Sequence, residues 1–152
     1  MTISSAADMN TNFILSIFTS LLLNILACIH IYWAFGGLWP GTNQQDLINK
    51  VFGRGNQFPS PFSCLVVAVG LVLFSSLPVL WLVRINLDLS PQITNLIRYS
   101  MIFVAIVFLV RGIIGYLPWV TKHWEPIFVR YTKRLYNPIS LLIGFSFLLM
   151  SI

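Results

Sequence analysis

Residues 99–119 read YSMIFVAIVFLVRGIIGYLPW, an apolar run that contains one charged side chain, Arg111. The run is long enough to cross a bilayer, since one helical span needs about 20 mostly apolar residues. A guanidinium in hydrocarbon costs about 2.5–3.5 kcal/mol on insertion scales, so it is expected to be paired, hydrated or directed toward the interface. We therefore look for function around Arg111.

The rest of the chain has the same apolar character. Of its 152 residues, 57% are hydrophobic and 9% are charged, and the mean hydropathy is +0.85. A soluble domain of this size cannot bury so much apolar surface, so the sequence predicts an integral membrane protein. The predicted fold is all-α: a single domain, residues 1–152, that forms a four-transmembrane-helix bundle. Its predicted spans are residues 13–35, 61–83, 96–117 and 138–152.

The fourth predicted span is short. Residues 138–152 reach about 22 Å as a helix, which is less than the roughly 30 Å hydrocarbon core. Two alternatives follow. Either this helix begins before Pro138, or it ends short of the far interface.

Lys and Arg are distributed unequally between the two sides of the predicted bundle. The first and third connections carry six of them: Lys50, Arg54, Lys122, Arg130, Lys133 and Arg134. The opposite side carries only Arg84 and Arg98. Under the positive-inside rule the two basic connections face the cytoplasm, and both termini lie on the non-cytoplasmic side. The net charge of +5 then indicates attraction to anionic lipid headgroups and not binding to nucleic acid.

The first connection has the pattern of a short interfacial helix. Thr42 and Gln45 have the spacing of a capping box, in which each side chain satisfies a backbone N–H of the other residue. The apolar residues from Leu47 to Phe52 then recur on one helical face. A short amphipathic helix is therefore predicted here.

The third connection is longer and also predicts an interfacial helix. Arg130, Lys133 and Arg134 fall on one side of it, and apolar residues fall on the other. Asn137 followed by Pro138 has the pattern of a helix cap with proline at the first helical position. This pair is expected to bend the chain from the surface helix into the last span.

The depths of two polar side chains suggest a binding site. His30 lies about five residues before the end of its span and Arg111 about six, which places both roughly 8–9 Å below the same surface. Trp33 shares a helical face with His30, and Tyr116 adds an aromatic donor at the rim. We expect His30, Trp33, Arg111 and Tyr116 to form a ligand-binding pocket.

Simpler roles remain open for these residues. Arg111 has a stem long enough to reach about 6 Å toward the headgroups. His30 can donate to a carbonyl of a neighbouring helix and stay neutral. Tyr32, Trp33 and Trp39 are typical of the aromatic belt found at membrane interfaces.

The sequence lacks the signatures of common catalytic sites. The acidic residues all lie outside the predicted spans: Asp8, Asp46, Asp88 and Glu125. Cys28 and Cys64 are too few and too far apart for a CxxC redox centre or a zinc site. No Walker loop, dinucleotide-binding glycine pattern or HExxH motif occurs. We predict no catalytic residue, metal or cofactor, and we expect membrane lipid and a small amphipathic molecule as partners.

The string HIYWAFGG at residues 30–37 resembles the hallmark of a family of small, four-span bacterial membrane proteins of unknown function. The resemblance continues in residues 67–71, 111–116 and 136–139, and it covers roughly residues 24–150. Similar proteins often carry an acidic residue where this chain has Thr132. The resemblance implies four helices and a bacterial inner membrane, and it supplies no substrate.

The leading hypothesis is a non-catalytic bundle that binds a lipid headgroup or an amphipathic small molecule in its cytoplasmic half. Arg111 would supply the charge, His30 would orient the ligand, and the two loop helices would form a lid. An alternative is a small membrane enzyme that acts on a lipid or quinone-like substrate. A third hypothesis is an accessory subunit of a membrane complex, or a homo-oligomer, packed through the small residues Ser140 and Gly144.

Overall fold

The computed structural model describes residues 3–84 and 86–152, and every regular element within these ranges is helical. Four of the described helical segments are long and apolar enough to cross a membrane: Asn10–Ala34, Pro61–Val83, Pro91–Ile114 and Pro126–Ser151. The prediction of an all-α chain with four membrane-spanning helices is confirmed.

The second and third spans begin in the same way. α3 (Pro61–Val83) follows Ser60, whose hydroxyl oxygen accepts a hydrogen bond from the Ser63 N–H at 3.2 Å. α4 (Pro91–Ile114) follows Ser90, which accepts from the Ile93 N–H at 3.4 Å. In both helices a serine caps the free N–H groups, and proline occupies a position where no helical donor is lost.

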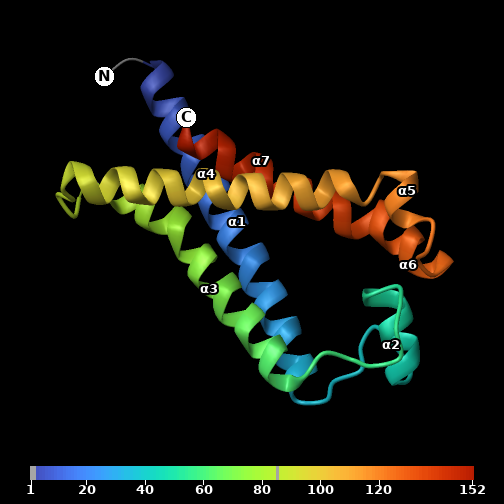
Figure 1. Ribbon diagram of the computed structural model, residues 1–152. Helices are drawn as coiled ribbons and strands as arrows, with labels where there is room; N and C mark the ends of the chain where they lie inside the picture. Colours follow the sequence, from blue (N-terminus) through green and yellow to red (C-terminus); the bar gives the residue numbers. More distant parts are fainter. Residues whose placement is uncertain (1–2, 85) are drawn as a thin grey trace.

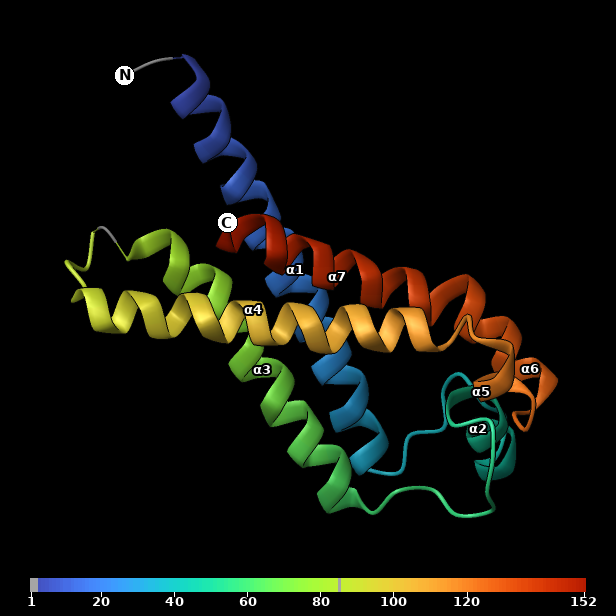
Figure 2. The same ribbon diagram turned by 45° about the horizontal axis from the view of Figure 1, so that its top comes forward.

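The four long helices form two antiparallel pairs that cross (Figures 1 and 2). α1 (Ile3–Ala34) packs along α3, and α4 packs along α7 (Asn137–Ser151). The pairs meet in a buried core that includes Leu23 of α1, Met101 of α4 and Phe147 of α7. From this core the pairs diverge toward the C-terminal ends of α1 and α4. We call that end of the bundle the open end.

Small residues allow α4 and α7 to pack closely. A Cβ atom placed on Gly144 would lie 2.7 Å from the side chain of Leu109, and one on Gly112 would lie 2.7 Å from that of Leu141. Ser140 is buried as well. Gly144 of the predicted small-residue pair therefore makes a helix contact within the chain, whereas the Ser140 hydroxyl donates to the carbonyl oxygen of Tyr136 in its own helix.

The short helix in the first connection is α2 (Gln44–Val51), and its cap differs from the predicted one. Asn43 caps the helix, because its side chain accepts from the Asp46 N–H at 2.9 Å. Asp46 in turn accepts from the backbone N–H of Thr42 at 2.8 Å and from its hydroxyl at 3.1 Å. The assignment of Thr42 and Gln45 as a capping box was wrong by one residue, since a carboxylate at position 46 accepts better than the amide at 45.

The last span is one continuous helix, so the predicted bend at Asn137–Pro138 was wrong. α6 (Pro126–Tyr131), the π-helix η1 (Thr132–Tyr136) and α7 follow each other without a break. Of the two alternatives for the fourth span, the structure shows the earlier start. A proline ring excludes the ordinary α-helical hydrogen bond, and the wider π-turn before Pro138 accommodates the ring without ending the helix.

Candidate functional site

Arg111 is a cation for which the described part of the chain supplies no counter-ion. It lies in the last turn of α4, where a positive charge also interacts favourably with the helix dipole. Its side chain has accessible surface, although the protein around it reduces its hydration. Among the described residues it has no hydrogen bond and no ion pair, and Tyr136 of η1 is its electrostatic neighbour. Its charge is therefore available to a ligand.

The position of Arg111 along α4 places it beside the space between the helix pairs. Ile97, Met101 and Val104 form the stripe of α4 that packs into the core. Arg111 follows Val104 by two helical turns and so continues the same side of the helix. Arg111 therefore emerges where the core stripe reaches the open end.

Tyr116 holds the end of α4 against the π-helix. In η1 the carbonyl of Lys133 would pair with the N–H five residues later, but that residue is Pro138, which has none. The hydroxyl of Tyr116 donates to this carbonyl oxygen at 3.2 Å. Tyr116 thus supplies the donor that proline removes, and its hydroxyl is engaged in the structure.

Two buried polar side chains lie against Gly115, one turn after Arg111. A Cβ atom on Gly115 would lie 2.4 Å from Asn137 Oδ1 and 2.7 Å from the methyl group of Thr132. Asn137 and Thr132 have no exposed surface, and Thr132 Oγ1 and both amide atoms of Asn137 lack a partner in the part of the chain that is described. Unpaired buried polar atoms cost about 1–3 kcal/mol each. π-Turns occur frequently at functional sites, which makes this segment a candidate.

Neither Thr132 nor Asn137 was among the predicted site residues. Asn137 was interpreted as a helix cap, and Thr132 as a departure from similar proteins. A signal was present, because Thr132 and Asn137 are five residues apart directly before a proline, which is the spacing of one π-turn.

The α2 connection closes the open end. The hydroxyl of Tyr136 donates to the carbonyl oxygen of Lys50 at 3.0 Å. The backbone N–H of Glu125 donates to the carbonyl oxygen of Gly53 at 2.8 Å. Gly53 has φ +70° and lies so close to the ring of Phe128 that a Cβ atom would meet it at 2.1 Å. Tyr136, the neighbour of Arg111, is therefore also a residue that fastens α2 to the last helix.

His30 and Trp33 form a separate group on α1. Their rings meet edge to face, with centroids 5.1 Å apart. His30 Nδ1 lies 2.8 Å from the carbonyl oxygen of Leu26, and a carbonyl only accepts, so Nδ1 carries the proton and Nε2 remains free. The indole N–H of Trp33 donates to the carbonyl oxygen of Trp39 at 2.7 Å, which leaves only its ring faces for contact.

The four predicted site residues thus fall into two groups. His30 and Trp33 lie near the end of α1, whereas Arg111 and Tyr116 lie at the end of α4 against η1. The two helices diverge toward these ends (Figures 1 and 2), and no hydrogen bond or ring contact in residues 3–84 and 86–152 joins the groups. Both groups border the open end. A pocket shared by all four residues stays a prediction.

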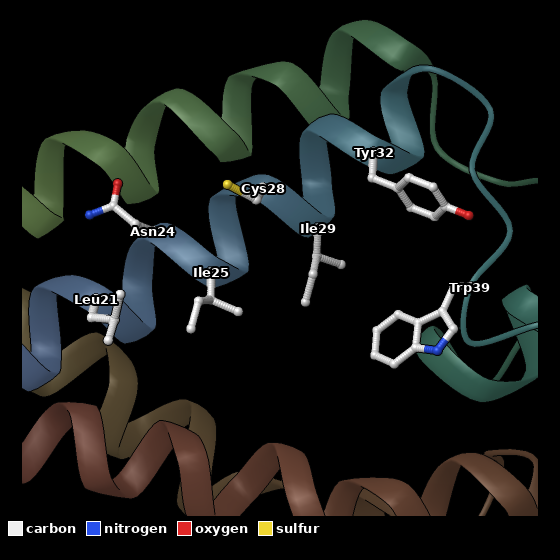
Figure 3. A pocket seen from close by; sticks show the side chains of 7 residues that line it. All are labelled: Leu21, Asn24, Ile25, Cys28, Ile29, Tyr32 and Trp39. Carbon is white, nitrogen blue, oxygen red and sulfur yellow. The ribbon is translucent and has the colours of Figure 1, made fainter.

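An apolar groove of about 520 Å³ runs along α1, and we call it the α1 groove. Ile25 and Ile29 project from α1 into it, and the ring of Trp39 stands at one end (Figure 3). None of the four predicted site residues lines it. The residues that line it are Leu21, Asn24, Ile25, Cys28, Ile29, Tyr32 and Trp39.

A family model described as Protein of unknown function (DUF3995) matches residues 23–147. The match includes the HIYWAFGG string, most of the core, Arg111 and the buried pair beside Gly115. No curated protein matches the chain, and neither does any solved structure.

Proposed function

This chain belongs to the DUF3995 family, and we propose that it binds the anionic headgroup of a membrane lipid, or an amphipathic small molecule with the same anionic group, at Arg111. The observation that carries the proposal is a guanidinium in a membrane-spanning helix that no described residue pairs with. In a span such a charge requires an anion or water. An anionic headgroup in the adjoining leaflet meets this requirement without any protein carboxylate.

The chemistry of the side chain favours an oxyanion. A guanidinium presents planar, parallel N–H donors that match two oxygens of one phosphate or carboxylate. Lysine offers a point charge without this pair of parallel donors. We therefore expect lysine at position 111 to bind the anionic group more weakly than arginine does. We expect Arg111 to form two parallel hydrogen bonds to one anionic group.

The α2 connection acts as the lid in this proposal. Its hydrogen bonds from Tyr136 to Lys50 and from Glu125 to Gly53 are each worth about 0.5–1.5 kcal/mol net. Two hydrogen bonds of this strength break and re-form by thermal fluctuation. They lie next to the proposed anion site, because Tyr136 takes part in one of them and is also the neighbour of Arg111. A ligand at Arg111 would therefore be covered by α2.

His30 and Trp33, on α1 of the other helix pair, contribute further contacts to the ligand in this proposal. His30 continues the face of α1 on which Leu23 and Leu26 pack into the core, so it is directed toward the space between the pairs. Because Nδ1 is bound to Leu26, a neutral His30 offers an acceptor at Nε2, and a protonated one offers a donor. Trp33 would pack its ring on the apolar part of the ligand.

Native mass spectrometry of the purified full chain tests the proposal. The protein is transferred from nanodiscs that contain phosphatidylglycerol and phosphatidylcholine, and the retained lipids are counted. We expect wild type to retain phosphatidylglycerol preferentially, Arg111→Lys to retain less, and Arg111→Ala to lose the preference. Arg54→Ala is the matched control, because Arg54 is an exposed cation in the same connection as α2. Equal retention of the anionic lipid by wild type and Arg111→Ala would refute the proposal.

A further inference from the structure

Two aromatic residues form one end of the α1 groove: Tyr32, which belongs to the HIYWAFGG string, and Trp39, which follows it. The ring of Tyr32 lies directly against Gly37, since a Cβ atom there would come within 2.2 Å of it. The backbone of Trp39 is held in place, because its carbonyl oxygen accepts the indole N–H of Trp33 at 2.7 Å. Gly37 therefore borders the ring of Tyr32, and Trp33 holds the backbone that carries Trp39. The anion site at Arg111 uses neither Tyr32 nor Trp39.

The polar atoms of these two rings are free. Neither the hydroxyl of Tyr32 nor the indole N–H of Trp39 has a hydrogen-bond partner within the described ranges. Figure 3 shows both rings at the same end of the groove, with Ile29 and Ile25 following along α1. The groove thus has an apolar length and two hydrogen-bond donors at one end.

The dimensions of the groove match one leaflet. The helical rise from Leu21 to Tyr32 is about 16 Å, and half of a roughly 30 Å hydrocarbon core is about 15 Å. Tyr32 lies only two residues before the end of α1, so the donors sit at the level of the interface. Leu21 and Ile25 are exposed, which opens the groove sideways to the membrane.

We propose that the α1 groove binds one acyl chain of a glycerolipid, with the ester carbonyl oxygen accepting hydrogen bonds from Tyr32 and Trp39. Within the membrane, a hydrocarbon chain is the ligand that suits an apolar groove. The ester carbonyl at the head of an acyl chain supplies an acceptor for the two donors. Amphipathic aromatic rings suit this boundary, where one end is apolar and the other is polar. This binding is independent of the anion site, so it does not require a charged headgroup.

The experiment uses the full chain in nanodiscs of phosphatidylcholine that carries a photoreactive diazirine in the middle of one acyl chain. After irradiation, the crosslinked peptides are mapped by mass spectrometry. We expect adducts to concentrate on residues 21–32. Gly37→Ala, which displaces the ring of Tyr32, and Trp39→Ala should each lower these adducts several-fold. Phe35→Ala is the control, since Phe35 belongs to the same string and is 83% exposed.

The outcomes separate this inference from the proposed function. Arg111→Ala should leave the adducts unchanged even where it abolishes retention of anionic lipid. Ile25→Trp is a second variant, for use if Trp39→Ala does not fold. Its larger side chain should fill the groove and so lower the number of adducts. The inference would be overturned if the groove and Val69, an exposed residue of α3, were labelled equally and no variant changed this labelling. That result would indicate ordinary annular lipid. Loss of the adducts on addition of an isoprenoid quinone would also overturn it, in favour of a quinone site.

Discussion

Tyr116→Phe tests whether the tyrosine hydroxyl replaces the donor that Pro138 removes. The variant leaves the carbonyl of Lys133 without a protein donor. A hydrogen bond contributes about 0.5–1.5 kcal/mol net, and Tyr116 is partly exposed, so water can take over some of the loss. We therefore expect the free energy of unfolding to fall by about 1 kcal/mol in a detergent-denaturation titration.

A double-mutant cycle makes this expectation specific. In a Pro138→Ala background residue 138 regains its N–H, so the Lys133 carbonyl has a helical partner and Tyr116→Phe should cost much less. The coupling between the two sites is then expected to be of order 1 kcal/mol. Tyr99→Phe, at an exposed tyrosine of α4 without a described hydrogen bond, should have no effect. An equal loss from Tyr116→Phe in both backgrounds would refute the reasoning.

Three further predictions concern the lid and the helix pairs. Tyr136→Phe should raise hydrogen exchange in residues 44–51, because its hydroxyl fastens α2; unchanged exchange would contradict this. Gly144→Leu should separate α4 from α7 and destabilise the chain by about 1–3 kcal/mol, whereas Gly70→Leu, with nothing within 4 Å, should not. The pKa of Asp46 lies below its ordinary value of 3.8, mainly because of the hydrogen bond from Lys50 and secondly because of that from the Thr42 N–H. The contribution of Asp46 to α2 is thus complete above that value and is lost as pH falls through the lowered pKa. Protection of α2 should therefore decrease in acid, and Asp46→Asn should remove this dependence.

The spans were predictable because membrane hydropathy is a local property of the sequence. The residues predicted for the second span, 61–83, are those of α3, and the Ser-Pro start is visible in the sequence. The start of the last helix was not predictable from the same signals. A proline at the first position of a helix and a proline after a π-turn look alike until the packing against Gly115 and Tyr116 is known.

The candidate site was predictable only in part. Arg111 stands out from hydropathy alone, and its lack of a described protein counter-ion agrees with the absence of acidic residues from the predicted spans. Equal depth places Arg111 and His30 at the same level and does not determine how far apart the two side chains lie, because the helix pairs diverge toward the open end. The buried pair Thr132 and Asn137 depends on which face of the last helix meets α4, and that is decided by tertiary contacts.

The central claim is that an anionic group contacts Arg111 within the membrane. Solid-state NMR tests it directly on the full chain, with ¹³C- and ¹⁵N-labelled arginine in bilayers that contain phosphatidylglycerol. The Arg111 signals are assigned by their disappearance in Arg111→Lys. We expect a direct dipolar contact between the Arg111 guanidinium carbon and lipid phosphorus, and no such contact for Arg54. A guanidinium that exchanges with water and shows no contact with phosphorus would contradict it.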